Sequence, residues 1–84
     1  MSTFENSVQV IIGATGGIGS ALARRLQSQG AKLLLASRDE AKTVALANEL
    51  GAIPFTVDAT KTSEVEAAVD HAVEIYGRID GIAN

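Results

Sequence analysis

The sequence has 84 residues, 46% hydrophobic and 20% charged, with a net charge of −3, so it suffices for one small domain and lacks the basic excess of nucleic-acid-binding proteins. The absence of cysteine excludes disulfides and cysteine–zinc sites, and one histidine cannot make a histidine-rich metal site. Without a secretory signal or an apolar run of membrane-spanning length, we expect a cytoplasmic globular protein with no membrane partner.

Short apolar runs alternate with helical apolar stripes along the chain. We predict strands at residues 8–12, 32–36, 53–57 and 78–84, with the sequence ending inside the fourth. The stripes of the three intervening helices are Ile18, Ala21, Leu22 and Leu26, then Ala41, Val44, Ala45 and Leu50, then Val65, Ala68, Val69, Ala72, Val73 and Tyr76. This alternation is typical of βαβ units, so the predicted class is α/β, with helices covering both faces of a parallel sheet.

Glycine and proline support these boundaries. Gly30, Gly51 and Gly77 each follow a predicted helix, at the position where a left-handed backbone is common. Ser63 and Glu66 have the spacing of a capping box at the third helix. Pro54 requires the third strand to be an edge, as it is in the doubly wound strand order 3-2-1-4.

A glycine-rich turn, Gly-Ala-Thr-Gly-Gly-Ile-Gly at residues 13–19, connects the first strand to the first helix. Glycines let a pyrophosphate approach the backbone, and free N–H groups and the helix dipole attract its charge. The predicted cofactor-binding residues of this turn are Gly13, Thr15, Gly16, Gly17, Ile18 and Gly19. The alternative is a tight turn that binds nothing, in which Gly19 serves only helix packing.

This turn and the Ser-Ala-Leu-Ala after it resemble the cofactor turn of the short-chain dehydrogenase/reductase family, although many members have threonine at the position of Ile12. The resemblance continues at Asp58-Ala59 and at residues 77–84, where Asn84 matches the first asparagine of the family's Asn-Asn-Ala-Gly signature. It covers nearly the whole chain. It implies that residues 1–84 are the N-terminal part of a Rossmann-type NAD(P)-binding domain. It also implies hydride transfer to a carbonyl or from an alcohol, in proteins that are usually homo-oligomers.

The end of the second strand indicates which cofactor binds. An acidic residue about 20 residues beyond the glycines would bond the ribose hydroxyls of NAD, but Ser37 and Arg38 stand there. The arginine fork can pair with a 2′-phosphate, so we expect NADP(H) to be favoured over NAD(H). A solvated Arg38 paired with Asp39 or Glu40 is the alternative. Gly16 weakens the prediction, because some NADP-using relatives carry a second basic residue near that position.

The resemblance also assigns roles after the third and fourth strands. Asp58, with Ala59, would meet the adenine edge, whereas the alternative is a turn aspartate that bonds nearby N–H groups. Asn84 would be a further cofactor contact.

No catalytic residue is predicted. The family uses a Tyr-x-x-x-Lys pair and a preceding serine, but Tyr76, the only tyrosine, is followed by Asp80 at that spacing. We therefore predict that Tyr76 belongs to the core and that His71 is a solvated surface residue. We expect a fragment that is inactive and marginally stable by itself.

Three functions remain open. The first is the cofactor part of an NADP(H)-dependent reductase acting on a small carbonyl or alcohol. The second is a non-catalytic, redox-sensing NAD(P)-binding module. The third, an extended-branch nucleotide-sugar epimerase, fits the spacing of Gly13, Gly16 and Gly19, whereas Gly17 and the Ile-Ala-Asn ending favour the first.

Overall fold

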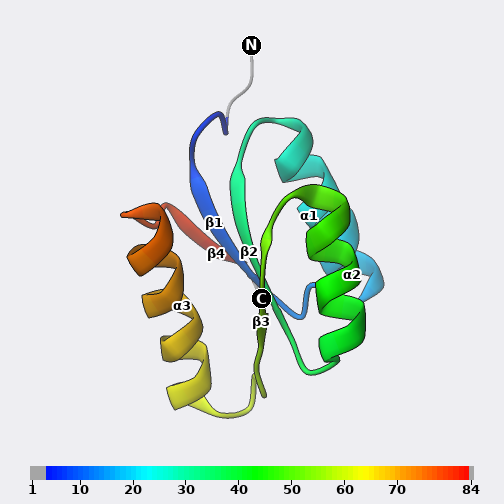
Figure 1. The fold of residues 1–84 in the computed structure, drawn as a ribbon, viewed down its shortest axis with the longest axis vertical. Coiled ribbons are helices and arrows are strands. Elements are labelled where there is room, and N and C mark those ends of the chain that lie inside the picture. The colour runs from blue at the N-terminus through cyan, green and yellow to red at the C-terminus, as the bar shows by residue number, and fades with distance from the viewer. Residues whose placement is uncertain (1–3, 84) are drawn as a thin grey trace.

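The structure, a computed structural model that describes residues 4–83, contains a parallel sheet between two layers of helices (Figure 1). Its elements are β1 (Val8–Ile12), α1 (Gly17–Ser28), β2 (Lys32–Ser37), α2 (Glu40–Leu50), β3 (Ile53–Thr56), α3 (Thr62–Tyr76) and β4 (Gly81–Ala83). The strand order is β3-β2-β1-β4, which confirms the predicted α/β class and the order 3-2-1-4.

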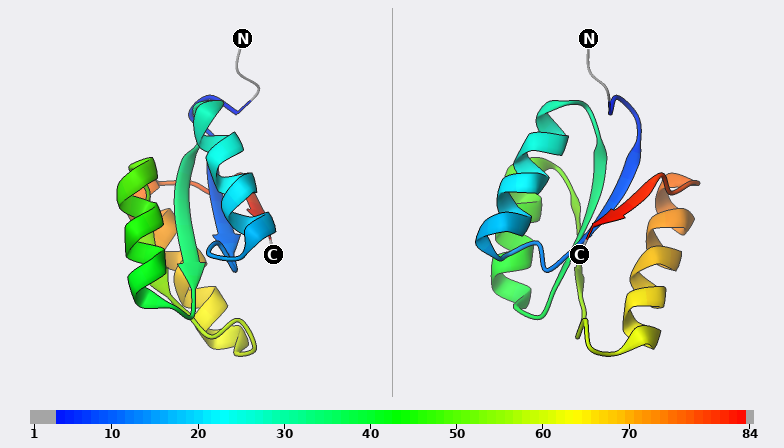
Figure 2. Two further views of the ribbon diagram at one scale, coloured as in Figure 1. Left: turned by 90° about the vertical axis from the view of Figure 1, so that its right-hand side faces the viewer. Right: turned by 180° about the vertical axis from the view of Figure 1, so that it is seen from behind.

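Helices cover both faces of the sheet. α1 and α2 lie on one face and α3 on the other, as the two further views in Figure 2 show. Neighbouring residues of β2 alternate between the two cores, so Leu33 and Leu35 pack toward α1 and α2, whereas Leu34 and Ala36 pack toward α3. This two-sided burial explains why the strand is a continuous apolar run rather than an alternating one.

β3 forms one edge of the sheet. Within the described chain it pairs with β2 alone, and Pro54 lies opposite Leu35 in that ladder. Proline has no N–H group to donate, which an edge strand tolerates because one of its sides has no neighbouring strand. The prediction from Pro54 is confirmed.

The three predicted helix-ending glycines all have a left-handed backbone, with φ of +86° at Gly30, +64° at Gly51 and +81° at Gly77. The N–H of Gly77 donates to the carbonyl of Val73 at 2.8 Å and so closes the last turn of α3. These helix ends are confirmed.

The predicted capping box at Ser63 and Glu66 is wrong. α3 begins at Thr62, with Lys61 as its N-cap residue and no side-chain capping bond, so Ser63 already lies inside the helix. The carboxylate that bonds a backbone N–H here is that of Glu64, which accepts from Asp58 at 3.0 Å. The helix start is therefore stabilised by a bond to the preceding loop.

The buried face of α2 also differs from its predicted stripe. Ala41, Val44 and Ala45 are exposed, whereas the buried residues are Thr43, Leu46 and Ala47. Thr43 can be buried because its hydroxyl donates to the carbonyl of Asp39 at 2.6 Å. In the other helices Ile18, Ala21 and Val73 are exposed against expectation, and Ala23 is buried instead.

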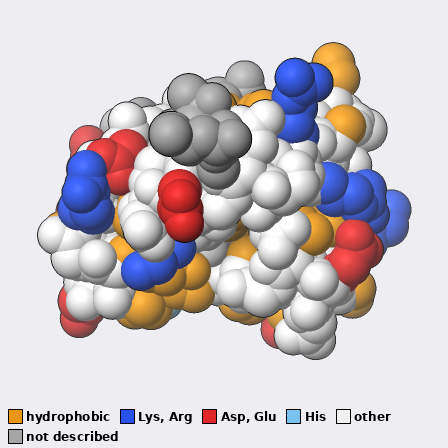
Figure 3. Space-filling view, turned by 90° about the horizontal axis from the view of Figure 1, so that it is seen from above, with side chains coloured by type: hydrophobic (Ala, Val, Ile, Leu, Met, Phe, Trp, Pro, Cys, Tyr) orange, Lys and Arg blue, Asp and Glu red, His pale blue; other side chains and the backbone are white. Residues whose placement is uncertain are grey.

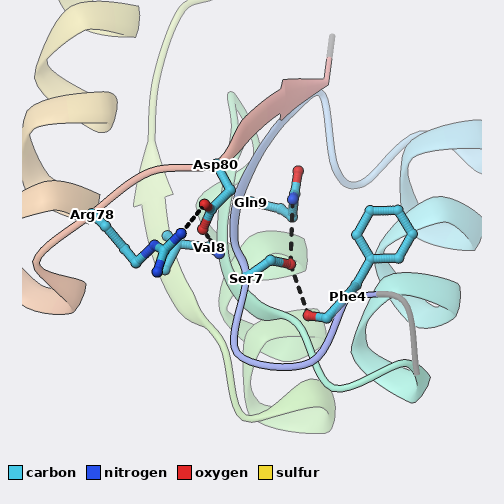
Figure 4. A network of polar contacts seen from close by, with 6 residues as sticks. All are labelled: Phe4, Ser7, Val8, Gln9, Arg78 and Asp80. Carbon is cyan, nitrogen blue, oxygen red and sulfur yellow. Dashed lines mark hydrogen bonds and ion pairs between the residues drawn. The ribbon is translucent and has the colours of Figure 1, made fainter. Parts of the chain in front are cut away.

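A polar cluster joins the starts of β1 and β4 (Figure 4). The Asp80 carboxylate accepts the N–H of Val8 at 2.7 Å and forms an ion pair with Arg78. Because residues 78–80 form this connection, β4 begins at Gly81 rather than at residue 78 as predicted. The bond from Asp80 fixes the register of β4 against β1.

Candidate dinucleotide site

The glycine-rich turn is fixed to the end of β2. Gly13, with φ of +76°, and Ala14 both donate their N–H groups to the carbonyl of Ala36, at 2.7 and 3.2 Å. The N–H of Ser20 donates to the carbonyl of Gly16 at 2.8 Å and starts the hydrogen bonds of α1. The N–H groups of residues 17–19 precede it in the first turn, where a helix leaves them without partners of its own. The start of α1 therefore has N–H groups without partners within the helix, and anion binding there stays a prediction.

The four glycines of the turn are small for different reasons. A side chain at Gly19 would overlap the carbonyl oxygen of Gly13, so packing of α1 on the turn explains this glycine. At Gly16 a Cβ would lie 3.5 Å from that oxygen, an ordinary contact, and at Gly17 it would meet nothing within 4 Å. Packing within the described chain thus leaves Gly17 unexplained, and an approaching ligand would explain it. The non-binding alternative accounts for Gly19 by packing and for Gly13 by its φ of +76°, but not for Gly17.

A surface hollow of about 470 Å³ lies between this turn, α1 and β4. Its lining includes the turn glycines, Ile12, Leu22 and Ala83. Ile18, which is 89% exposed, lines it as well. The size and the mainly apolar lining are typical of small-molecule sites.

A hydrogen bond links the turn to the residue where the sequence places the adenosine ribose. The hydroxyls of Thr15 and Ser37 lie 2.7 Å apart, and Ser37 is buried at the end of β2. The structure thus brings these two predicted site residues into contact.

Arg38 is exposed and lines a smaller hollow, of about 210 Å³, with Val57, Asp58 and Glu64. Its charge is one of the influences that lower the pKa of Asp58. Within residues 4–83 it forms no ion pair with Asp39 or Glu40, and Asp39 instead accepts the N–H of Lys42 at 3.0 Å, which caps α2. The pairing with Asp39 or Glu40 is therefore wrong, whereas the solvated Arg38 of that alternative agrees with its exposure.

Asp58 forms the local turn that was the alternative to its predicted adenine contact. Its Oδ1 accepts the hydroxyl of Thr60 at 2.6 Å and the Thr60 N–H at 3.0 Å. These two bonds, the hydroxyl first, lower the pKa of Asp58 and keep it ionised. Thr60 was missed, although the Asp-x-Thr spacing is a signal for such a turn. Ala59 is exposed beside it, and Asn84 lies outside the described residues.

Tyr76 and His71 are structural in this chain. The Tyr76 hydroxyl donates to the carbonyl of Leu33 at 3.0 Å, and partial burial raises the pKa of this phenol. His71 is half-buried rather than solvated, because its ring packs against Phe55 with centroids 5.1 Å apart. No group of three His, Cys, Asp or Glu side chains that could hold a metal exists within residues 4–83.

The surface carries charges of both signs. Figure 3 views the molecule from above the view of Figure 1, and on this face Lys and Arg side chains are interspersed with Asp and Glu.

In the part of the chain that the structure describes, no helix is long and apolar enough to cross a membrane.

A protein-family model described as short chain dehydrogenase matches residues 7–84. The chain belongs to this family. The chain is 36% identical to the mitochondrial borneol dehydrogenase of Lavandula x intermedia, over 95% of this chain and 31% of the relative. The predicted family membership and Rossmann-type fold are confirmed.

Two solved structures are similar to this chain. A 3-ketoacyl-(acyl-carrier-protein) reductase from Brucella melitensis, complexed with NADH, is 34% identical with a TM-score of 0.87, over 93% of this chain and 33% of that one. A short-chain dehydrogenase/reductase from Burkholderia phymatum, in complex with NAD, is 34% identical with a TM-score of 0.89, over 98% and 31%. This chain spans about a third of the length of the curated relatives it matches.

Proposed function

We propose that residues 1–84 bind the nicotinamide cofactor NADP(H) for an oxidoreductase that transfers hydride between this cofactor and a carbonyl or alcohol. The observation that carries the proposal is the turn at residues 13–19, where the first residues of α1 line a hollow and Gly17 is small without a packing reason. In this assignment the turn holds the pyrophosphate through N–H groups and the helix dipole.

The cofactor, when bound, supplies the hydride. The residues of this chain bind and orient it. Thr15, Ser37 and Arg38 form the subsite of the adenosine ribose, and Asp58 with Ala59 flanks the adenine. Asn84 is a further contact. We assign no proton-transfer role to Tyr76, because its hydroxyl is bonded to the backbone of β2.

The preference for NADP(H) rests on this chain's own residues, because the two solved relatives hold NADH and NAD. Ser37 places no carboxylate where one would bond the ribose 2′-hydroxyl and repel a phosphate. Arg38 is exposed beside it and forms no ion pair within the described residues. Its planar guanidinium suits a 2′-phosphate.

Titration of the intact protein with NADPH and NADH, followed by nicotinamide fluorescence, tests the proposal. We expect tighter binding of NADPH, and we expect Arg38→Ala to weaken it about tenfold to a hundredfold while leaving NADH binding unchanged. Arg25→Ala is the matched control, since Arg25 is an exposed arginine in the last turn of α1. Equal affinity of the native protein for the two cofactors contradicts the assignment.

A further inference from the structure

The two ends of the groove between α1 and α2 differ in charge. It holds a hollow of about 290 Å³, lined by Thr15 of the turn, by Ser20 and Arg24 of α1 and by Lys42 and Glu49 of α2. Arg24 donates two hydrogen bonds to the carboxylate of Glu49, at 2.9 and 3.2 Å, so these two charges offset each other. The charge that remains in the lining is that of Lys42.

Lys42 lies at the end of this groove that is next to the cofactor turn. Both helices follow parallel strands, so both begin at the same edge of the sheet. Lys42 is in the first turn of α2, and Glu49 is seven residues further on, about 10 Å along the helix axis. Thr15, whose hydroxyl bonds that of Ser37, lines the same hollow as Lys42.

The bonded pair Thr15 and Ser37 thus has a cation next to each member, because Lys42 shares a hollow with Thr15 and Arg38 follows Ser37 in the chain. Arg38 lines one hollow, the smaller one next to β3 that Asp58 and Glu64 also line. Lys42 lines the other hollow, the one between α1 and α2.

We infer that Lys42 is a second cation of the 2′-phosphate subsite and a determinant of the preference for NADP(H). The inference rests on the proposed function. A phosphate monoester carries between one and two negative charges at neutral pH, more than one guanidinium offsets. An ammonium on a flexible stem can supply the second contact from the α2 side. The Asp39 carboxylate accepts the N–H of Lys42 and caps the helix.

The test uses the intact protein with Lys42→Gln, Lys42→Arg and the control Lys32→Gln, which removes an equivalent charge at the other end of β2. The probes are NADPH, NADH and 2′,5′-ADP, each titrated at low and high salt. We expect Lys42→Gln to weaken binding of NADPH and 2′,5′-ADP about tenfold, to leave NADH unchanged and to reduce the salt dependence of NADPH binding. Lys42→Arg should keep most of the affinity, and Lys32→Gln all of it.

The outcomes separate the two proposals. If Lys42→Gln binds NADPH as tightly as the native protein while Arg38→Ala does not, the role of Lys42 is refuted and the proposed function stands. Equal losses for NADPH and NADH in Lys42→Gln also refute it, because they show a role unrelated to the 2′-phosphate. A native protein that does not prefer NADPH refutes both.

Discussion

Thr15 of the glycine-rich turn and Ser37 at the end of β2 share a hydrogen bond of 2.7 Å between their hydroxyl oxygens. The two residues are 22 positions apart, and the bond fixes the turn relative to the strand on which cofactor selection is proposed to depend. Either oxygen can donate, so one hydroxyl hydrogen remains available to a ligand.

We expect Ser37→Asp to reverse the cofactor preference. A carboxylate at this position would accept hydrogen bonds from both ribose hydroxyls and would repel a 2′-phosphate. NADPH affinity should fall more than about tenfold and NADH affinity should rise, as measured by fluorescence titration. Ser63→Asp is the matched control, since Ser63 is exposed in the first turn of α3. An unchanged ratio of the two affinities would show that Ser37 does not face the ribose.

Alanine at two glycines should separate folding from binding. Gly17→Ala should leave the free energy of unfolding unchanged or slightly raised, because a Cβ there meets nothing, and should weaken dinucleotide binding about tenfold or more. Gly19→Ala should lower that free energy by about 1–3 kcal/mol, because the Cβ overlaps the carbonyl of Gly13. Urea unfolding and NADPH titration measure the two effects. Native-like binding by Gly17→Ala would remove the main support for a pyrophosphate at this turn.

Tyr76→Phe should lower the free energy of unfolding by about 1 kcal/mol, since it removes the hydrogen bond to Leu33 and keeps the ring. The bond lies near the start of β2, whereas the glycine-rich turn lies at the end of the sheet where β1 and β2 stop. NADPH affinity should therefore not change. Urea unfolding and a cofactor titration of the same variant check both statements, and a large loss of affinity would contradict the structural role.

Asp80 should make the fold sensitive to acid. The hydrogen bonds from Arg78 and from the N–H of Val8 lower the pKa of Asp80 below its unfolded value of about 3.9. Its stabilising contribution is therefore complete above about pH 4 and is lost as the pH falls through the lowered folded pKa. Asp80→Asn should reduce the acid dependence of the melting temperature between about pH 2 and 5, measured by circular dichroism. Some dependence should remain, because the pKa of Asp58 is lowered too.

The control for this experiment is Asp70→Asn, an exposed aspartate in the middle of α3. The melting temperature of this variant should depend on pH as that of the native chain does. If the melting temperature of Asp80→Asn does so as well, ionisation of the Asp80 carboxylate contributes nothing measurable to stability.

The elements and their order were predictable because the strongest local signals agreed. Gly30, Gly51 and Gly77 marked the helix ends, and Pro54 marked the edge strand, each through a backbone constraint that is independent of packing. The glycine-rich turn was predictable for the same reason.

The failures concern interactions that depend on tertiary contacts. The face of α2 was misplaced because Thr43 buries a hydroxyl that bonds the carbonyl of Asp39. The cap of α3 was misplaced because Glu64 bonds backwards to Asp58 rather than within its own helix. His71 was assigned to solvent because nothing in the sequence indicates that α3 lies beside Phe55. Motifs indicated the turn glycines that line one hollow and Arg38 and Asp58 that line another. The groove at Lys42 could not be predicted, because it depends on how α1 packs on α2.

The position of β1 between β2 and β4 has a consequence for the proposed function. After β3 the chain crosses to the other side of β1, so the residues proposed to distinguish the adenosine end of the cofactor stand on one flank of the first strand. The hollow bordered by Ile12 and Ala83 stands on the other. On the proposed function, substitutions at Ser37 or Arg38 change which cofactor is preferred without altering the hollow on the other side of β1.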